Sequence, residues 1–503
     1  MSQIFANLWY GFGVSMQPAN LLLVTLGGVL GTVIGMLPGL GPATGVAVLL
    51  PMTYAMNPTG AMITMCGVYY GAMYGGSRAS ILINTPGDGA AIASTFDGYP
   101  MAMQGRAEAA LAISAIASFI GGMISNLFIT FAATPIAMLA LKFGPSEYFL
   151  LMLAALAMTA SMNKGNVLKG FIGMFFGLAI STVGLDAQSG VERFTFGNLS
   201  LQSGIDFLVV IIAMYALGEV YKSYKDISEG KKKMQTKFKR IWITREDWQH
   251  SWKAIFRSCP LGFVIGALPG AGGTMASLVS YNLEKSLSKH PEEFGKGAIE
   301  GLAAPESANN SASVGALIPM LTLGVPGSGT TAVMMGALLM LGLQPGPLLF
   351  EQHPDVAWGL IASMFIGNLI LALVNIPLAG GLVRVLSIPP KVLYPIVMGL
   401  AFIGCYAISN RLSDFYLLII FSLVGYFFMK VNIPTAPMIL AVIVGNTMEV
   451  SFRQALVVSN GSYGIFLSSA VDKILAVIVV VSIVYPLAKT MVNGMRRKET
   501  AHA

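Results

Sequence analysis

Four Pro-Gly pairs interrupt apolar stretches of this 503-residue sequence. They occur in GMLPGLGP (35–42), TPGDGAA (85–91), GALPGAGG (266–273) and VPGSGTT (325–331). Pro lacks a backbone hydrogen-bond donor and Gly costs about 1 kcal/mol in a helix interior, so each pair is expected to end a helix. The helix that follows presents free N–H groups and about half a positive charge, which suits a carboxylate. The four pairs therefore predict an anion site.

The predicted anion-binding residues lie at the four breaks and in a polar segment before the last one. They are Gly39, Gly41, Thr44, Asn84, Thr85, Pro86, Gly87, Gly270, Gly272, Asn309, Asn310, Pro326, Gly327, Ser328, Gly329 and Thr330. Unwound backbone carbonyls can hold sodium and a nearby carboxyl can carry a proton, so an accompanying Na⁺ or H⁺ is expected at Asp88, Glu306 and Ser307. No other cofactor is expected. No metal site is predicted either, because the three cysteines lie in apolar stretches without ligand-like spacing.

Each of these assignments has an alternative that the sequence leaves open. The Gly and Pro residues could serve only tight helix packing or re-entrant turns. Residues 304–310 could form a capped interfacial turn instead of an intramembrane site, and Asp88 could face the cytoplasm. Arg78, the first charged residue of the chain, could pair with a substrate carboxylate or extend to the membrane interface.

The elements that must position these residues are membrane helices. The chain is 55% hydrophobic and 11% charged, against about a quarter charged in soluble domains. Apolar runs near the length of about 20 residues that spans a bilayer predict an all-α polytopic membrane protein with about ten to twelve transmembrane helices. The runs lie at roughly 20–37, 108–135, 146–162, 166–185, 204–221, 258–275, 355–384, 391–409, 412–430, 434–449 and 464–487.

Charge divides the chain into parts. Residues 222–257 hold eleven Lys or Arg against four Asp or Glu, which predicts a basic cytoplasmic linker between a first membrane repeat (1–221) and a second one (258–450). Residues 276–305 are expected outside the membrane, and 451–503 are expected to form a last transmembrane helix and a cytoplasmic tail. A solvated linker is favoured over a nucleic-acid contact, so membrane lipid is an expected partner and nucleic acid is not.

The two halves resemble each other in sequence. Pro86 and Pro326 are 240 residues apart (326 − 86), and Pro38 and Pro269 are 231 apart (269 − 38), as expected for a duplicated unit with small insertions. Loop charges place equivalent spans in opposite directions. The prediction is therefore two inverted-topology repeats with re-entrant or broken helices, an architecture typical of secondary transporters.

Several long motifs resemble a known family. They are GMLPGLGPATGVAVLLP, YYGAMYGGSRASILINTPGDGAA, GALPGAGG, APESANNSASVGALIPMLTLGVPGSGTTAVMMGAL and GLQPGP. These motifs are similar to those of the large membrane subunit, often called TctA, of the bacterial tripartite tricarboxylate transporters. The likeness extends from about residue 18 to 490.

The resemblance implies a multi-pass permease of the bacterial inner membrane that imports a citrate-like tri- or dicarboxylate and is driven by a cation gradient. It also implies a periplasmic solute-binding protein and a small four-helix membrane subunit as partners. An anion channel, or a carrier that needs no binding protein, is the alternative. An intramembrane enzyme is disfavoured, because GxSxG, HExxH and GxxxxGK[ST] motifs are absent from the sequence.

Overall fold

The computed structural model describes residues 2–37, 40–161, 167–186, 188–217, 242–270, 272–376, 395–396, 398–399, 401–403, 405–406 and 411–502. Apart from one two-stranded antiparallel ribbon, β1 (Gly184–Leu185) with β2 (Glu192–Arg193), the regular elements of this part of the chain are helices. The all-α fold class is confirmed. The inverted orientation of the repeats stays a prediction.

The first half of the chain contains helices of different lengths and two π-helical turns. They are α1 (Ser2–Ser15), α2 (Pro18–Met36), α3 (Pro42–Thr53), α4 (Pro58–Ile83), α5 (Ile92–Met101), the π-helical turn η1 (Ala102–Arg106), α6 (Ala107–Ala140), α7 (Pro145–Ser161), α8 (Val167–Ser181), α9 (Leu199–Gln202), α10 (Phe207–Ile211) and the π-helical turn η2 (Ile212–Leu217).

The second half begins with the same succession of broken helices. Its elements are α12 (Arg245–Ala267), α13 (Gly272–Leu287), the 3₁₀ turn η3 (Pro291–Glu293), α14 (Ile299–Gly315), α15 (Leu317–Leu323), α16 (Gly329–Met340), α17 (Leu349–Gln352), α18 (Pro354–Asn375), α21 (Ser413–Lys430), α22 (Thr435–Val458), the 3₁₀ turn η5 (Tyr463–Leu467) and α23 (Ala470–His502).

Five of these segments are long and apolar enough to cross a bilayer. They are Pro18–Met36, Ile92–Ala140, Pro354–Asn375, Ser413–Lys430 and Thr435–Val458. Shorter apolar helices lie beside them, among them α3, α8 and α16. The predicted spans at 355–384 and 391–409 lie partly outside the described residues, as does most of the basic linker. The structure places residues 245–257, the end of that predicted linker, in α12, whose start is capped by Thr244.

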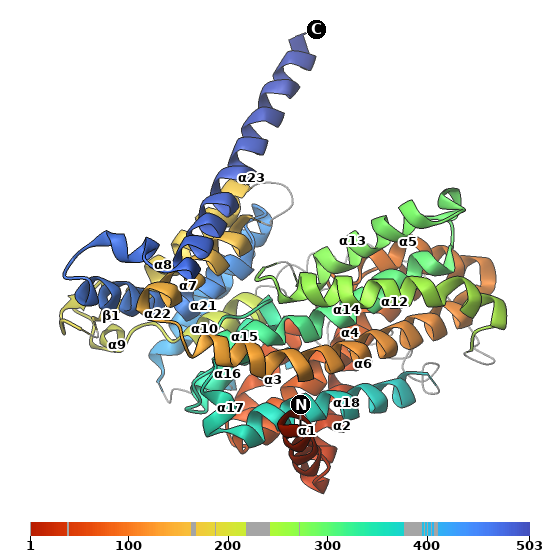
Figure 1. The fold of residues 1–503 in the computed structure, drawn as a ribbon, viewed down its shortest axis with the longest axis horizontal. Helices are drawn as coiled ribbons and strands as arrows, with labels where there is room; N and C mark the ends of the chain where they lie inside the picture. Colours follow the sequence, from red (N-terminus) through yellow and green to blue (C-terminus); the bar gives the residue numbers. More distant parts are fainter. Residues whose placement is uncertain are drawn as a thin grey trace.

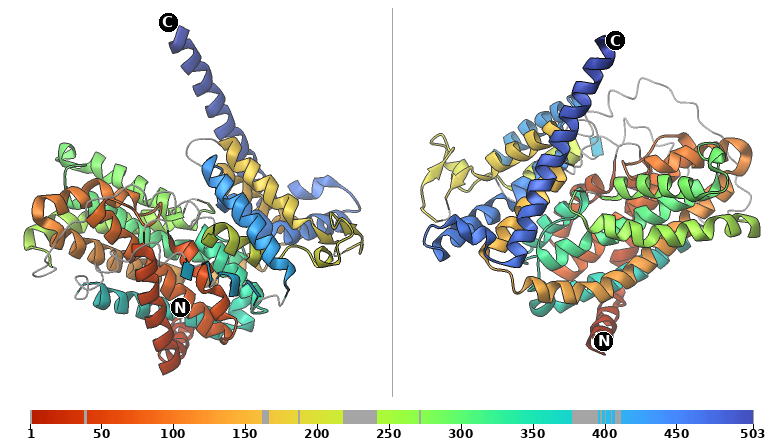
Figure 2. Two further views of the ribbon diagram at one scale, coloured as in Figure 1. Left: turned by 180° about the vertical axis from the view of Figure 1, so that it is seen from behind. Right: turned by 45° about the horizontal axis from the view of Figure 1, so that its top comes forward.

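The described helices form two bundles (Figure 1). The larger contains α1 to α6 and α12 to α18, and the smaller contains α7, α8, α10 and α21 to α23. One principal core of buried apolar side chains runs through both bundles. Helix α23 extends beyond the smaller bundle (Figure 2). The interior is therefore continuous where the two bundles meet.

All four predicted breaks are present. They lie between α2 and α3, α4 and α5, α12 and α13, and α15 and α16, and we number them first to fourth. Leu37 and Leu268 cap α2 and α12 with almost the same backbone angles (φ −84°, ψ 119° and φ −81°, ψ 120°). Asn84 and Gly324 cap α4 and α15 in the left-handed region, at φ 51° and 68°. The same backbone geometry thus recurs at the sequence offsets 231 (268 − 37) and 240 (324 − 84).

Glycines bring the paired helices of the larger bundle close together. A Cβ added at Gly35 of α2 would overlap the backbone of Ala72 in α4, and one at Gly266 of α12 would overlap the backbone of Ala312 in α14. Small residues allow such close approach of membrane helices. The two contacts are again related by the offsets 231 (266 − 35) and 240 (312 − 72). The helix pairs that carry the breaks are therefore packed in a corresponding way in both halves.

Ion pairs hold the far end of α22. The Arg453 Nη1 atom lies 2.9 Å from Asp186 Oδ2, and Arg193 Nη1 lies 2.8 Å from Glu449 Oε1. The carboxyl of Asp186 follows α8 and lies outside the predicted membrane spans. Its pKa is lowered below the ordinary 3.8 by the backbone N–H of Gln188 and by the Arg453 guanidinium. These contacts fasten α22 to the ribbon of β1 and β2.

The ion pairs predict a pH dependence of stability. Because the folded-state pKa of Asp186 is lowered, its ionised form stabilises the fold above about pH 4, and this contribution is lost as the pH falls further. The difference in Tm between the protein and Asp186→Asn should be largest near neutral pH and should shrink toward about pH 3. Thermal unfolding in detergent measures it. A difference that stays constant over this range would contradict the prediction.

The glycine packing predicts a difference between two Gly→Ala variants. Gly266→Ala should lower the free energy of unfolding by about 1–3 kcal/mol, because the added methyl group must push α12 and α14 apart. The matched control is Gly13→Ala in α1, where a Cβ meets nothing within 4 Å and helix propensity favours Ala. Denaturant unfolding in detergent compares them, and equal stability of both variants would refute the packing argument.

Candidate functional site

The four breaks border one cavity of about 710 Å³. Helices of both bundles contribute to its wall, since α7, η2 and the start of α22 complete the lining. Eleven residues of the predicted site line this cavity: Gly41, Thr44, Pro86, Gly87, Asp88, Gly270, Gly272, Pro326, Ser328, Gly329 and Thr330. The breaks are therefore brought together as expected, whereas ligand binding at these residues stays a prediction.

Close contacts link each break to the next. A Cβ added at Gly41 of the first break would lie 3.0 Å from the Cβ of Asp88 in the second. One added at Gly89 of the second break would lie 2.6 Å from the Thr274 hydroxyl at the start of α13. Between the third and fourth breaks, the N–H of Gly270 donates to the carbonyl of Gly327 at 3.1 Å. The glycines at the breaks thus allow four chain segments to surround one cavity.

Five helices begin at residues that line the cavity. They are α3, α5, α13, α16 and α22, which start at Pro42, Ile92, Gly272, Gly329 and Thr435. The first-turn N–H groups of a helix have no intrahelical acceptor. Each helix start also carries roughly half a positive charge. The cavity wall is therefore rich in partial positive charge that comes from backbone.

Nine backbone N–H groups among the first three residues of four helices on the cavity wall have no acceptor among the residues that the structure describes. Helix α13 supplies three of them, and α3, α16 and α22 supply two each. They belong to Ala43, Thr44, Gly272, Gly273, Thr274, Gly329, Thr330, Thr435 and Ala436. An unpaired backbone donor is costly unless a ligand or water accepts from it. These groups can hold an anion without any basic side chain.

Hydroxyl groups supplement the backbone donors. Ser328 caps α16, since its Oγ accepts from the N–H of Thr331 at 3.2 Å and its own N–H donates to Thr331 Oγ1 at 2.8 Å. The Tyr69 hydroxyl lies 3.5 Å from Ser328 Oγ. Thr330 is 6% exposed, lines the cavity, and makes no side-chain hydrogen bond within the described part of the chain. Its hydroxyl is available to a ligand.

Charged side chains are scarce on the cavity wall. Asp88 is the one acidic residue among the described lining residues, which include no Lys, Arg or His. Its Oδ1 accepts from the backbone N–H of Ala91 at 3.1 Å, just before α5 begins. This side chain is half-buried and borders the cavity, and the side of the membrane that it faces stays a prediction.

The remaining predicted residues lie elsewhere or are not described. Gly39 lies outside the described residues. Asn84 is exposed, Thr85 donates to the carbonyl of Ile83, and Gly327 only accepts the bond from Gly270. The others belong to α14 and do not line the cavity: Glu306, Ser307, Asn309 and Asn310. Residues 304–310 are buried in the middle of that helix, so the alternative of an interfacial turn is wrong.

Glu306 lies in a separate serine cluster, which we define as Glu306 with Ser77, Ser94 and Ser118. Its side chain is fully buried. Its carboxylate accepts from Ser77 Oγ at 2.8 Å, from Ser118 Oγ at 3.1 Å and from Ser94 Oγ. Ser307 is not part of this cluster, because its hydroxyl donates to the carbonyl of Ile255 in α12. The cluster ties α14 of the second half to α4, α5 and α6 of the first.

Arg78 is also away from the cavity. It is 3% exposed within α4, and its guanidinium donates to the carbonyl of Asn375 at the end of α18. The interpretation that it extends to the membrane interface is therefore wrong. Arg78 does not line the cavity, so it offers no direct contact to a ligand there.

Comparison with known proteins identifies the family. Residues 21–440 match the model of the tripartite tricarboxylate transporter TctA family. The chain belongs to this family. It is therefore the large membrane subunit of a tripartite tricarboxylate transporter, a multi-pass permease whose family implies partner subunits.

Two relatives of this TctA-family chain come from Agrobacterium vitis. An uncharacterized 52.8 kDa protein in the TAR-I ttuC' 3'region is 39% identical over 474 residues, which cover 94% of each chain. An uncharacterized protein in the TAR-II ttuC' 3'region is 43% identical over 210 residues, 42% of this chain and 87% of that protein. No solved structure matches.

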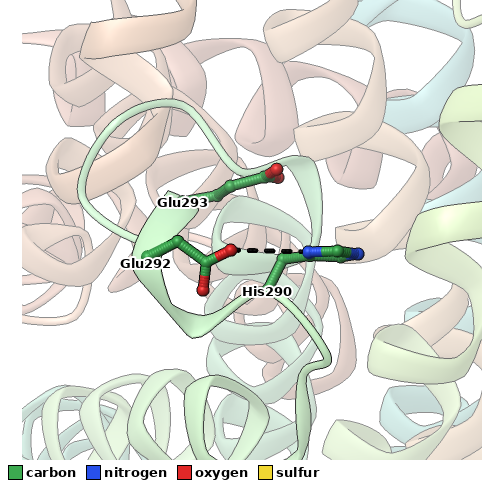
Figure 3. A group of neighbouring side chains, drawn as sticks. All are labelled: His290, Glu292 and Glu293. Carbon is green, nitrogen blue, oxygen red and sulfur yellow. Dashed lines mark ion pairs between the residues drawn. The ribbon is translucent and has the colours of Figure 1, made fainter.

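A second group of polar side chains lies far from the cavity in the TctA-family chain. His290, Glu292 and Glu293, around the turn η3, place their ligand atoms within 4.8 Å of one another (Figure 3). All three are exposed, and His290 Nδ1 lies 3.4 Å from Glu292 Oε1. We assign no metal site here, because nothing beyond the proximity of these surface groups indicates one.

Sequence reasoning missed several residues of the cavity wall. Pro434, Thr435 and Pro437 mark the start of α22, and the sequence IPTAP was recognised only as the beginning of an apolar run. Its closely spaced prolines could have indicated a helix start like those at the breaks. Tyr69 begins the motif YYGAMYGGSRASILINTPGDGAA and Tyr215 lies in the apolar run at 204–221, but neither pattern indicates a cavity residue, so only their contacts reveal them.

Substitution of Ser328 tests the fourth break. Ser328→Leu should abolish uptake of a labelled tricarboxylate, because it fills cavity space and removes the α16 cap, which is worth about 1 kcal/mol. Ser328→Thr keeps the capping hydroxyl and should retain uptake. Membrane insertion of both variants is checked by immunoblot of washed membranes. Normal uptake by the Leu variant would exclude this break from the site.

Proposed function

We propose that this TctA-family chain is the permease subunit of a binding-protein-dependent secondary transporter. It imports tri- or dicarboxylates of the citrate kind across the bacterial inner membrane, driven by a gradient of Na⁺ or H⁺. A periplasmic solute-binding protein delivers the substrate, and a small four-helix membrane subunit completes the complex. The observation that carries the proposal is the convergence of helix starts on one cavity of about 710 Å³.

The chemistry of the cavity favours a carboxylate. Four helix starts supply nine backbone N–H groups without acceptors among the described residues. Such donors, together with the helix dipoles, bind carboxylates and phosphates well. Their fixed positions cost little reorganisation when the ligand arrives. Because the described lining holds no Lys or Arg, backbone N–H groups and neighbouring hydroxyl groups would hold the charge of the substrate.

The two halves of the chain suggest how the cavity opens alternately to the two sides of the membrane. The cavity is bounded by breaks from both halves and by α7, η2 and α22 of the smaller bundle. Transporters built from inverted repeats exchange inward-open and outward-open states by moving one part against another around a central site. A movement of the larger bundle relative to the smaller one would open the cavity to either side. This motion is part of the proposal.

Reconstitution tests the proposed function. The chain should be purified with its small membrane subunit, inserted in liposomes and supplied with the solute-binding protein. We expect saturable accumulation of labelled tri- or dicarboxylate that requires the binding protein and an inward Na⁺ or H⁺ gradient. Scintillation counting after filtration measures it.

Two results would contradict the proposal. Flux that never exceeds the electrochemical equilibrium of the substrate and does not saturate would indicate a channel. Accumulation that is equally fast without the binding protein would indicate an independent carrier. Liposomes that contain the Ser328→Leu variant provide the matched control for leak.

A further inference from the structure

Asp88 is the one acidic side chain of the described cavity wall, and its negative charge would lie close to an anionic substrate. It lies in the second break, against Gly41 of the first, and so faces the space where a carboxylate is proposed to bind. No ion pair to Asp88 is found among the described residues, and none of the lining residues described is basic. An ionised Asp88 and an anionic substrate would repel each other in this partly buried space.

The local contacts of Asp88 compensate only part of its charge. Its Oδ1 accepts from the N–H of Ala91 at 3.1 Å, next to the start of α5. The backbone N–H of Ala90 also interacts with this carboxylate, whereas no side chain among the described residues donates to it. Of the five helix starts at the cavity, the one of α5 is therefore already matched by Asp88, and the other four remain for a substrate.

We propose that Asp88 holds a monovalent cation, Na⁺ or H⁺, inside the same cavity as the substrate carboxylate. This inference rests on the proposed function and deepens it by assigning the coupling site. A single positive charge neutralises a single carboxylate, which favours a monovalent over a divalent ion. The cation removes the repulsion, so each ligand strengthens binding of the other and coupling occurs by direct contact.

The serine cluster around Glu306 is the rival location for the coupling ion. There, three hydroxyl groups already donate to the carboxylate, and the group is fully buried. Glu306 does not line the cavity, so a substrate would not touch a cation bound to it. Three side-chain hydroxyls thus stabilise the charge of Glu306 without substrate, whereas no side chain among the described residues donates to Asp88.

The test measures citrate binding to the purified full chain in detergent by isothermal titration calorimetry. For the unsubstituted protein, citrate affinity should rise about 5- to 150-fold when NaCl replaces choline chloride at constant ionic strength, the usual range of such couplings. By reciprocity, citrate should raise the Na⁺ affinity by the same factor. In Asp88→Asn this dependence should disappear. The Asn side chain keeps an acceptor for the N–H of Ala91, so the break is preserved.

A second arm identifies a proton as the cation. Without Na⁺, citrate affinity would then rise as the pH falls, and this rise should also disappear in Asp88→Asn. The other titratable groups that face the cavity, Tyr69 and Tyr215, stay neutral over this range. The matched control is Asp355→Asn, which removes a carboxylate that binds Thr59 away from the cavity and should keep the full dependence.

The binding measurements distinguish an error in the proposed transport function from an error in the assignment of Asp88 as the cation site. If citrate, and then succinate as a second probe, fail to bind in any cation, the proposed function and the inference both fall. If binding is normal and its cation dependence survives in Asp88→Asn, only the inference is wrong. If the dependence disappears in Glu306→Gln instead, the coupling ion belongs to the serine cluster.

Discussion

The arrangement of this protein depends on one constraint, which is that backbone polar groups inside an apolar interior must find partners. Continuous helices satisfy this requirement within themselves, whereas the Pro-Gly breaks expose N–H and C=O groups at membrane depth. Here residues of all four breaks lie on the wall of a shared space. They border one cavity, and several bind each other, as Gly270 does to Gly327. A polar, ligand-sized space inside a hydrophobic chain follows from this requirement.

Close helix packing makes the arrangement possible. Gly35 against Ala72 and Gly266 against Ala312 bring the helix pairs α2 with α4 and α12 with α14 nearly into backbone contact. Three breaks lie at the ends of α2, α4 and α12, and the fourth follows α15, the short helix after α14, so the small residues that stabilise these pairs also help to fix where the breaks lie. Because both pairs repeat at the same sequence offsets, the cavity receives comparable contributions from each half.

Glu306, which is fully buried, and Asp88, which is half-buried, have different surroundings. Glu306 is enclosed by serine hydroxyls and connects α14 to three helices of the first half. Asp88 borders the cavity and accepts only from backbone N–H groups among the described residues. A carboxylate enclosed by side-chain donors contributes to the fold. One that borders a cavity lined by free N–H groups is suited to respond to what the cavity binds.

The sequence by itself determined the membrane class, the positions of the four breaks and eleven of the residues that line the cavity. These are local properties, because Pro and Gly end a helix whatever surrounds them and apolar length alone identifies a span. Only the tertiary structure shows that α22 adds a fifth helix start to the cavity and that Tyr69 and Tyr215 complete the cavity wall. It also shows that Glu306 and Arg78 lie away from this wall. Which face of a continuous helix meets a cavity depends on packing between segments hundreds of residues apart, and no local pattern encodes that choice.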